Sequence, residues 1–223
     1  MKPPLDNRRP LKSRDTGWAK AAAAGLAKSG VSPDAVSAGG LGFALIGAAA
    51  FVLGGVADGA ERLLALLLAA GCIQLRLLCN LLDGLVAVEH GKAGPYGPIW
   101  NEAPDRASDA LFLVGAGYGG ALMGIAWAEA AGWLAALAAV ATAYVRELGR
   151  GMRLPADFCG PGAKPQRMAI LTCAAVVAAA EPLWGWRGQS LAAGLALIAI
   201  LALVTVGLRI AHMAEALRAR RKA

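Results

Sequence analysis

The chain has 223 residues, of which 57% are hydrophobic and only 17% are charged. One soluble domain of this length cannot bury so much apolar surface, so the composition excludes an ordinary water-soluble fold and favours a membrane protein. The net charge of +7 comes from basic residues that flank the apolar runs, which indicates membrane orientation and not nucleic-acid binding.

The N-terminal segment, residues 1–34, is predicted to be cytosolic and to contain one short helix. Asp15 or Thr16 can cap this helix, and Gly30 can end it. Its apolar residues are interspersed with lysines, which is typical of a helix that lies in the membrane interface. The sequence Ser-Pro-Asp at 32–34 then predicts the next helix start, because serine caps, proline fits the first helical position and aspartate complements the helix dipole.

Several apolar runs reach the length of about 20 residues that a helix needs to cross a bilayer. Alanine, leucine and glycine dominate them, and small residues let membrane helices approach one another closely. We predict an all-α polytopic membrane protein with six spans at residues 35–56, 62–89, 103–127, 130–149, 166–184 and 189–212. The spans form one catalytic domain, residues 35–213, and a basic cytosolic tail follows at 214–223.

Basic residues are concentrated in the N-terminal segment, in the connection between the fourth and fifth spans, and in the tail. The other connections carry few of them, so the positive-inside rule places both termini in the cytosol. An even number of spans agrees with this topology. We expect an integral protein of a bacterial inner membrane with a cytosolic active site and contacts to membrane lipids, and no cleavable signal is visible.

The second span carries a polar stripe near its cytosolic end. At helical spacing its members fall within an arc of about 80°. They are Arg76, Asn80, Asp83, Gly84 and Ala87. Ionisable groups at this depth are costly unless they are paired, hydrated or metal-bound, so the stripe predicts a functional site.

A second, acidic stripe begins the third span. On a helix that starts near Asn101, with Pro104 tolerated in the first turn, it consists of Asn101, Glu102, Asp105 and Asp109. The short connection makes the two helices antiparallel neighbours, so the stripes can face each other across a cleft. Carboxylate and amide oxygens suit Mg²⁺ or Mn²⁺, and we predict a cage for such a cation. For any single residue, helix capping or ion pairing is an alternative role.

These stripes resemble the signature of the CDP-alcohol phosphatidyltransferases, D-x2-D-G-x2-A-R-x8-G-x3-D-x3-D. The chain has the same spacing, with Asn80, Asp83, Gly84, Ala87, Val88, Gly97, Asn101 and Asp105 at the signature positions. Asn80 and Asn101 replace aspartates, and Val88 replaces the arginine. The spans, the interfacial helix and the Ser-Pro-Asp start extend the resemblance over most of the chain.

The resemblance implies a Mg²⁺- or Mn²⁺-dependent enzyme of phospholipid biosynthesis with two metal ions. It would transfer a phosphatidyl or related phospho-alcohol group from a CDP-linked donor, such as CDP-diacylglycerol, to a hydroxyl acceptor and release CMP. Asp105 would be the catalytic base. The implied nucleotide-binding residues are Asn80, Asp83, Gly84, Ala87 and Gly97. Because the asparagines remove charge, we expect Glu102 and Asp109 to complete a metal set of Asn80, Asp83, Asn101 and Asp105.

The acceptor is expected to be a hydroxyl compound or a phosphorylated polyol. Arg146, Lys164 and Arg167, around the fourth-to-fifth connection, are predicted to bind its phosphate, although the positive-inside rule alone also explains their position. The four cysteines form no C-x-x-C pair and are interpreted as small apolar residues, not as metal ligands or a disulfide framework, so no histidine and cysteine set for zinc is expected. Asp157 and Cys159 receive no role. His90 is interpreted as a bystander. Dimers are common among such folds, so a homodimer is a further expectation, while nucleic acid is not an expected partner.

Two other functions stay open. The three departures from the signature are compatible with a non-catalytic descendant of the family that binds lipid or nucleotide. A small transporter could instead use intramembrane acids for ion coupling. That function needs polar groups at the bilayer midplane, whereas these residues gather near one edge.

Overall fold

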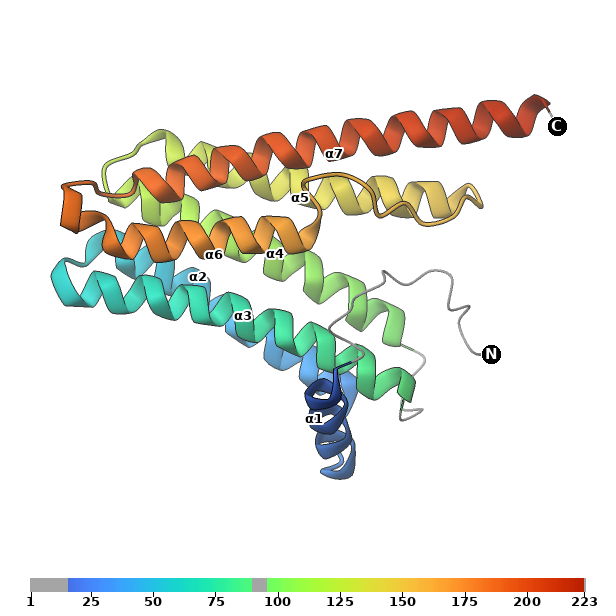
Figure 1. Ribbon diagram of the computed structural model, residues 1–223, viewed down its shortest axis with the longest axis horizontal. Helices are drawn as coiled ribbons and strands as arrows, with labels where there is room; N and C mark the ends of the chain where they lie inside the picture. The colour runs from blue at the N-terminus through green and yellow to red at the C-terminus, as the bar shows by residue number, and fades with distance from the viewer. Residues whose placement is uncertain (1–15, 90–95, 223) are drawn as a thin grey trace.

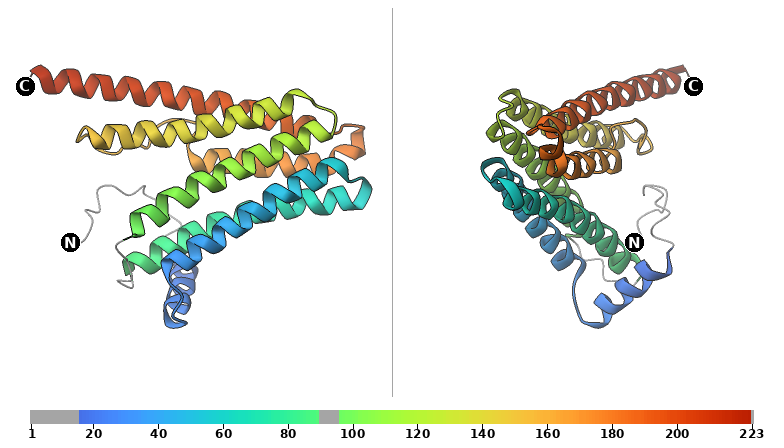
Figure 2. Two further views of the ribbon diagram at one scale, coloured as in Figure 1. Left: turned by 180° about the vertical axis from the view of Figure 1, so that it is seen from behind. Right: turned by 60° about the vertical axis from the view of Figure 1, so that its left-hand side comes forward.

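The computed structural model describes residues 16–89 and 96–222, and within these ranges the chain is helical and contains no strand. The elements are α1 (Gly17–Lys28), α2 (Pro33–Val56), α3 (Gly59–Glu89), α4 (Gly97–Leu122), α5 (Trp127–Gly151), α6 (Lys164–Ala180), the short 3-10 helix η3 (Glu181–Trp184) and α7 (Gln189–Lys222). Helices α2 to α7 form one elongated bundle, and α1 lies across one end of it (Figures 1 and 2).

The predicted fold class, an all-helical polytopic membrane protein, is confirmed. Within residues 16–89 and 96–222, five segments are long and apolar enough to cross a bilayer, namely α2, Gly59–Ala87 of α3, α5, Lys164–Trp184 and Gln189–Arg221. Helix α4 has 26 residues, which is also sufficient length, but charged residues crowd its first half. It packs between α2 and α5 and completes the bundle.

The start of α2 confirms the prediction from Ser-Pro-Asp. The Ser32 hydroxyl accepts a hydrogen bond of 3.1 Å from the backbone N–H of Ala35, and Pro33 is the first helical residue. The bounds of helix α1 also agree with the prediction, because Thr16 takes the N-cap position and the helix ends beside Ser29 and Gly30.

Helix α4 begins at Gly97, earlier than the predicted start near Asn101. The expectation that Pro104 lies in the first turn is therefore wrong, and Pro104 is inside the helix. Proline has no N–H, so the ordinary helical bond to the carbonyl of Trp100 is missing there. The helix stops before Gly124, whose φ of +105° is a backbone conformation that residues with a side chain rarely adopt.

Helix α7 continues well beyond the predicted end of the last span. Its final turns contain alanine, leucine, arginine and lysine, all of which favour a helix in water. With 34 residues the helix is about 51 Å long, more than the hydrocarbon thickness, so its basic end extends past the bundle (Figure 1).

Glycines allow α2 and α4 to touch backbone to backbone. A Cβ atom built on Gly55 would lie 2.8 Å from the carbonyl oxygen of Gly119, and one built on Gly115 would lie 2.8 Å from the Cα of Ala48. Larger side chains would push the helices apart. The predicted use of small residues for close packing is confirmed at this contact.

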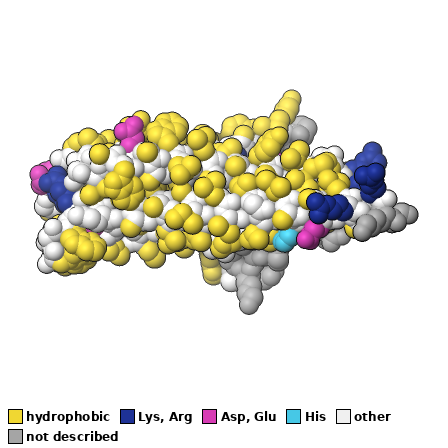
Figure 3. Space-filling model, turned by 90° about the horizontal axis from the view of Figure 1, so that it is seen from above, with side chains coloured by type: hydrophobic (Ala, Val, Ile, Leu, Met, Phe, Trp, Pro, Cys, Tyr) yellow, Lys and Arg dark blue, Asp and Glu magenta, His cyan; other side chains and the backbone are white. Residues whose placement is uncertain are grey.

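The outer surface of the bundle is apolar. Large side chains such as Leu45, Leu64, Leu137 and Ile200 are exposed along α2, α3, α5 and α7. Figure 3 shows hydrophobic side chains along the middle of one face, while charged side chains gather toward its two ends. This is the distribution expected of a surface that faces lipid in its middle and water at its ends.

Candidate functional site

A pocket of about 540 Å³ opens at the end of the bundle where α3 and α5 finish and α4 and α6 begin. One part of its wall is apolar and includes Trp18, Leu77, Leu78 and Leu81. The rest is strongly polar and includes Asn80, Glu102, Asp105, Arg106, Arg146, Glu147, Arg150, Lys164, Arg167 and Arg209. The pocket thus offers both an apolar and a charged surface to one ligand.

The two polar stripes face each other only in part, where Arg76 and Asn80 of α3 reach Asp105 of α4. The side-chain amide nitrogen of Asn80 donates a 2.7 Å hydrogen bond to Oδ1 of Asp105. Arg76 donates to the same oxygen through Nη2, and its Nε donates to Oγ of Ser108 at 2.8 Å. The helices otherwise touch little, because α2 packs against both of them. The polar contacts therefore hold this end of α3 and α4 together.

Asp105, the predicted base, is buried among cations. Lys164 Nζ lies 2.8 Å from its Oδ1, and Arg106 Nη2 lies 3.6 Å from its Oδ2. Arg76 forms a third ion pair with this carboxylate. The negative charge of Asp105 is therefore already neutralised by side chains of α3, α4 and α6.

Asp83 points away from the pocket and toward α2. Its Oδ2 accepts a 2.6 Å hydrogen bond from the Ser37 hydroxyl, while its Oδ1 is buried and has no hydrogen-bond partner. Of the predicted nucleotide-binding residues, Asn80 and Gly84 line the pocket, whereas Asp83, Ala87 and Gly97 do not. The side chains of Val88 and Asn101, like the whole of His90, lie outside the described part of the chain.

Asp109 and Arg167 form a buried pair at the pocket, in which Arg167 lines the wall and Asp109 does not. Arg167 Nη2 lies 2.7 Å from Asp109 Oδ2, and Arg167 Nη1 donates to the carbonyl of Gly162 at 2.6 Å. The Arg167 residue is only 1% exposed. It joins α4, α6 and the loop before α6, so its main contacts are structural.

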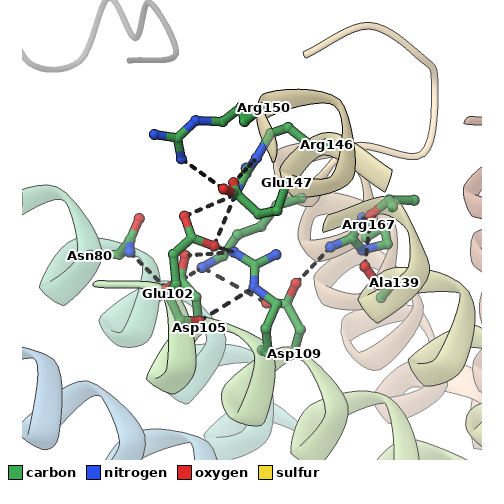
Figure 4. Close-up of polar contacts among 12 residues, drawn as sticks. Asn80, Glu102, Asp105, Asp109, Ala139, Arg146, Glu147, Arg150 and Arg167 are labelled. Atoms are coloured by element: carbon green, nitrogen blue, oxygen red, sulfur yellow. Dashed lines mark hydrogen bonds and ion pairs between the residues drawn. The ribbon is translucent and has the colours of Figure 1, made fainter. Parts of the chain in front are cut away.

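Arg146 of α5 binds both Glu102 of α4 and Glu147 of its own helix, as Figure 4 shows. Arg146 Nη2 lies 2.8 Å from Glu102 Oε1, and its Nε lies 2.9 Å from Glu147 Oε1. Arg150 contacts the other oxygen of Glu147 at 2.7 Å. All three predicted acceptor residues, Arg146, Lys164 and Arg167, thus line the pocket next to carboxylates.

The described network contains more cations than carboxylates. Its acids are Asp83, Glu102, Asp105, Asp109 and Glu147. Its cations are Arg76, Arg106, Arg146, Arg150, Lys164 and Arg167. A polar wall with this charge balance attracts anions, and arginine forks suit phosphate oxygens in particular.

The same contacts decide how a divalent cation fits. The buried, unpartnered Oδ1 of Asp83 is the kind of atom that a hard cation satisfies. Oδ1 of Asp105 is already occupied by Arg76, Asn80 and Lys164, whereas its Oδ2 has only Arg106, at 3.6 Å. Among the described residues, the acids of the pocket do not form a group of three whose oxygens converge closely enough to share one ion. A divalent cation at this site would therefore need these side chains to rearrange.

Some members of the site carry signals that the sequence analysis did not use. Arg209 lies on the apolar helix α7 and donates to the carbonyls of Thr142, at 2.6 Å, and Cys159, at 3.1 Å. An arginine inside an apolar span is itself a signal for a site. Ser37 and Ser108 have no such signal, because small hydroxyl residues are common in membrane helices.

No model of a protein family matches the chain, and no curated protein matches it. Solved structures do match, and three of them are crystal structures of phosphatidylinositol phosphate synthase PgsA1 from Mycobacterium tuberculosis. The one with CDP-DAG bound has a TM-score of 0.73 at 23% identity and covers 87% of this chain and 92% of that chain. The complex with manganese and citrate has a TM-score of 0.70 at 22% identity and covers 87% of this chain and 88% of that chain. The apo form has a TM-score of 0.66 at 24% identity and covers 86% of this chain and 94% of that chain. At these identities the likeness shows a shared fold.

Proposed function

We propose that this protein is a CDP-alcohol phosphotransferase of the membrane, which moves a phosphatidyl or related phospho-alcohol group from a CDP-linked donor to a hydroxyl acceptor. One observation carries the proposal: an amphipathic pocket with a cationic wall lies directly beside the signature residues Asn80, Gly84 and Asp105. A lipid-linked pyrophosphate needs both an apolar surface and a cationic surface. The pocket is large enough for part of such a ligand.

The fold supports the class of donor. A protein of the same fold has been crystallised with CDP-DAG bound. In the present chain, Gly84 on the pocket wall has no side chain and would let a nucleotide approach α3 closely. Leu77, Leu78 and Leu81 on the same helix would contact the lipid part.

The acceptor would bind on the side of α5 and α6. Arg146, Arg150 and Lys164 line that wall, and Arg209 reaches it from α7. Four cations at one end of a pocket exceed what an uncharged alcohol requires, so we propose an acceptor that carries a phosphate of its own. Glu102 and Glu147 keep Arg146 and Arg150 in position.

In the proposed reaction, the acceptor hydroxyl attacks the donor phosphorus that bears the lipid. The new P–O bond forms as the bond to the CMP oxygen breaks, and the hydroxyl proton passes to Asp105. Oδ2 of Asp105 would accept this proton, because only Arg106 lies near it, at 3.6 Å, whereas Lys164 contacts Oδ1.

The metal requirement belongs to this proposal. Asp83 and Asp105, with Asn80, Asn101, Glu102 and Asp109 as further donors, would hold Mg²⁺ or Mn²⁺. Such an ion, when bound, neutralises the pyrophosphate and the charge that develops on the leaving CMP. A protein of the same fold has been crystallised with manganese.

A specific observation favours a second function, that of a non-catalytic binding protein. The ion pairs of Asp105 with Arg76 and Lys164 need no bound metal to be stable. A site that is complete in this form could bind a CDP-lipid without turnover.

CMP release from labelled CDP-diacylglycerol separates the two functions. The purified protein is assayed in detergent with Mg²⁺ or Mn²⁺ and a panel of free and phosphorylated polyols. For the transferase we expect release that Asp105→Asn lowers at least about 100-fold, because the variant cannot accept the proton. Glu129→Gln, at the opposite end of the bundle, is the matched control and should keep full activity. Binding of CDP-diacylglycerol without CMP release on any acceptor would instead favour the binding protein.

A further inference from the structure

Three metal-ligating side chains meet outside the pocket, at the contact between the α5–α6 loop and α7. Asp157 Oδ2 lies 3.2 Å from Cys159 Sγ and 3.0 Å from His212 Nδ1. Cys159 Sγ lies 3.5 Å from the same ring nitrogen. Among the described residues, this is the group of histidine, cysteine and acidic side chains whose ligand atoms converge closely enough to share one metal ion.

The distances agree with a tetrahedral ion. Zinc lies about 2.0 Å from carboxylate oxygen and imidazole nitrogen and about 2.3 Å from sulfur, so tetrahedral ligand atoms are separated by about 3.3 to 3.6 Å. The observed separations of 3.0, 3.2 and 3.5 Å need only small outward shifts to reach these values. The three atoms thus already form one face of the required tetrahedron.

A catalytic role for Cys159 as a nucleophile explains the positions of these three side chains less well than a metal site does. In a catalytic relay, the nucleophile and the carboxylate contact opposite nitrogens of the histidine ring. Here both Cys159 and Asp157 contact Nδ1 of His212. One nitrogen cannot pass a proton from one of these partners to the other, whereas a metal ion can satisfy all three atoms at once.

The loop that carries two of the ligands is held firmly on α7. The backbone N–H of Cys159 donates a 2.8 Å hydrogen bond to Oδ1 of Asp157, which leaves Oδ2 facing the other ligands. Arg209 on α7 donates to the carbonyl of Cys159 at 3.1 Å. Gly160 has a φ of +106°, and a Cβ atom there would lie 2.8 Å from Cβ of Thr205, so only glycine lets the loop pack this closely. These contacts fix the ligands before any ion arrives.

We propose that Asp157, Cys159 and His212 form a binding site for a borderline divalent metal ion of the zinc class. Thiolate and imidazole ligands select such ions over Mg²⁺, which separates this site from the oxygen donors of the pocket. The thiol proton leaves when sulfur binds the metal. The His212 side chain is 53% exposed, so water can reach the site and take the fourth position.

The site would also stabilise the pocket wall. Residues 154–159 have no regular secondary structure, and within them Ala156 and Phe158 line the pocket while Asp157 and Cys159 contact α7. Arg146 lies 5.6 Å from the ring centroid of Phe158. A metal ion that ties the loop to α7 would therefore hold Phe158 against Arg146.

Cobalt substitution tests the site without any use of enzymatic activity. The full-length protein in detergent is stripped with a chelator, given excess Mg²⁺ and titrated with Co²⁺. We expect one equivalent of Co²⁺ with the ultraviolet absorption of a thiolate-to-cobalt bond, and displacement of this signal by Zn²⁺. Cys159→Ser should remove the absorption, and His212→Gln should weaken Co²⁺ binding at least about tenfold.

Cys173→Ser is the matched control, because Cys173 is an exposed cysteine of α6. It should leave the absorption unchanged. Size-exclusion chromatography of each variant distinguishes the loss of a metal ligand from the loss of the fold. If Cys159→Ser aggregates, the Co²⁺ affinity of His212→Gln tests the site instead, because His212 is exposed. The proposal is overturned if the folded wild type gives no thiolate absorption, or if the absorption persists in folded Cys159→Ser.

Discussion

Asp105 shows how neighbours decide the state of a signature residue. The family signature has four aspartates, whereas this chain has two of them and two asparagines, and its Asp105 is paired with Arg76 and Lys164. Asparagine removes negative charge, while the two cations supply positive charge at the place where metal ions are expected. We infer that the site depends more on fixed side-chain cations than the signature implies.

Asn80→Asp tests this balance. The new carboxylate would stand next to Asp105, since the Asn80 amide nitrogen is 2.7 Å from Asp105 Oδ1. We expect the affinity for Mn²⁺ to rise about tenfold or more, because affinity follows the number of charged ligands. Isothermal titration in detergent measures it, and Asn80→Ala is the control that should show no gain. An unchanged affinity in Asn80→Asp would show that no metal is bound beside residue 80.

The Asp109–Arg167 pair makes a prediction about stability. Replacing Arg167 by methionine leaves the buried Asp109 carboxylate with only Lys164, 3.8 Å away, which we expect to cost about 3 kcal/mol of unfolding free energy. The double variant Asp109→Asn with Arg167→Met should recover part of that loss, because no charge is then left unpaired. Denaturant titration in micelles provides the values. Equal losses in the single and double variants would contradict the role of this pair.

Helix α2 organises the neighbouring elements. It packs against α3 on one side and α4 on the other, and it contributes Ser37 to the hydrogen bond with Asp83. The polar stripes of α3 and α4 can face each other at one end because α2 keeps the two helices in register. Glycines set the distance between α2 and α4.

Gly119→Ala tests this close contact. A Cβ atom at Gly119 would collide with the carbonyl group of Phe51 on α2, so we expect a loss of about 1 to 3 kcal/mol of stability and a lower thermal midpoint in detergent. Gly71→Ala is the matched control, because a Cβ atom there meets nothing within 4 Å. That change should be neutral or slightly stabilising, since alanine favours a helix. Equal midpoints for the two variants would mean that α2 and α4 can separate without cost.

At the scale of the whole molecule, the connections divide into two sets. The pocket, the α5–α6 loop and the end of α7 lie at one end of the bundle, and the turns between α2 and α3, α4 and α5, and α6 and α7 lie at the other (Figures 1 and 2). The basic residues of the chain favour the pocket end. We propose that this end and both termini face the cytosol.

Reporter fusions test the topology in a bacterial host. A fluorescent protein that folds only in the cytosol should be bright when it is fused to either terminus. Alkaline phosphatase, which is active only in the periplasm, should be inactive at the termini and active when inserted at residue 124 in the turn between α4 and α5. Inactive alkaline phosphatase at residue 124, together with active enzyme at the termini, would contradict the proposed cytosolic position of the termini.

The sequence by itself determined the helices and the polar stripes. Hydrophobic length predicts the spans, and the Ser32 cap and the helical spacing of Asn80 and Asp105 depend on residues close together in the chain. Such local patterns do not need the rest of the fold. The early start of α4 was missed because its first turn contains glycine and proline, which usually mark a loop.

Only the tertiary structure decided which charges meet. Arg76 belongs to the same stripe of α3 as Asp83, but it pairs with Asp105, and Ser37 binds Asp83 instead. His212 lies more than fifty positions from Asp157, yet the close packing of the loop on α7 brings them together. These partners depend on how α2, α6 and α7 pack. The spacing of residues along the sequence does not give the distance between residues on different helices.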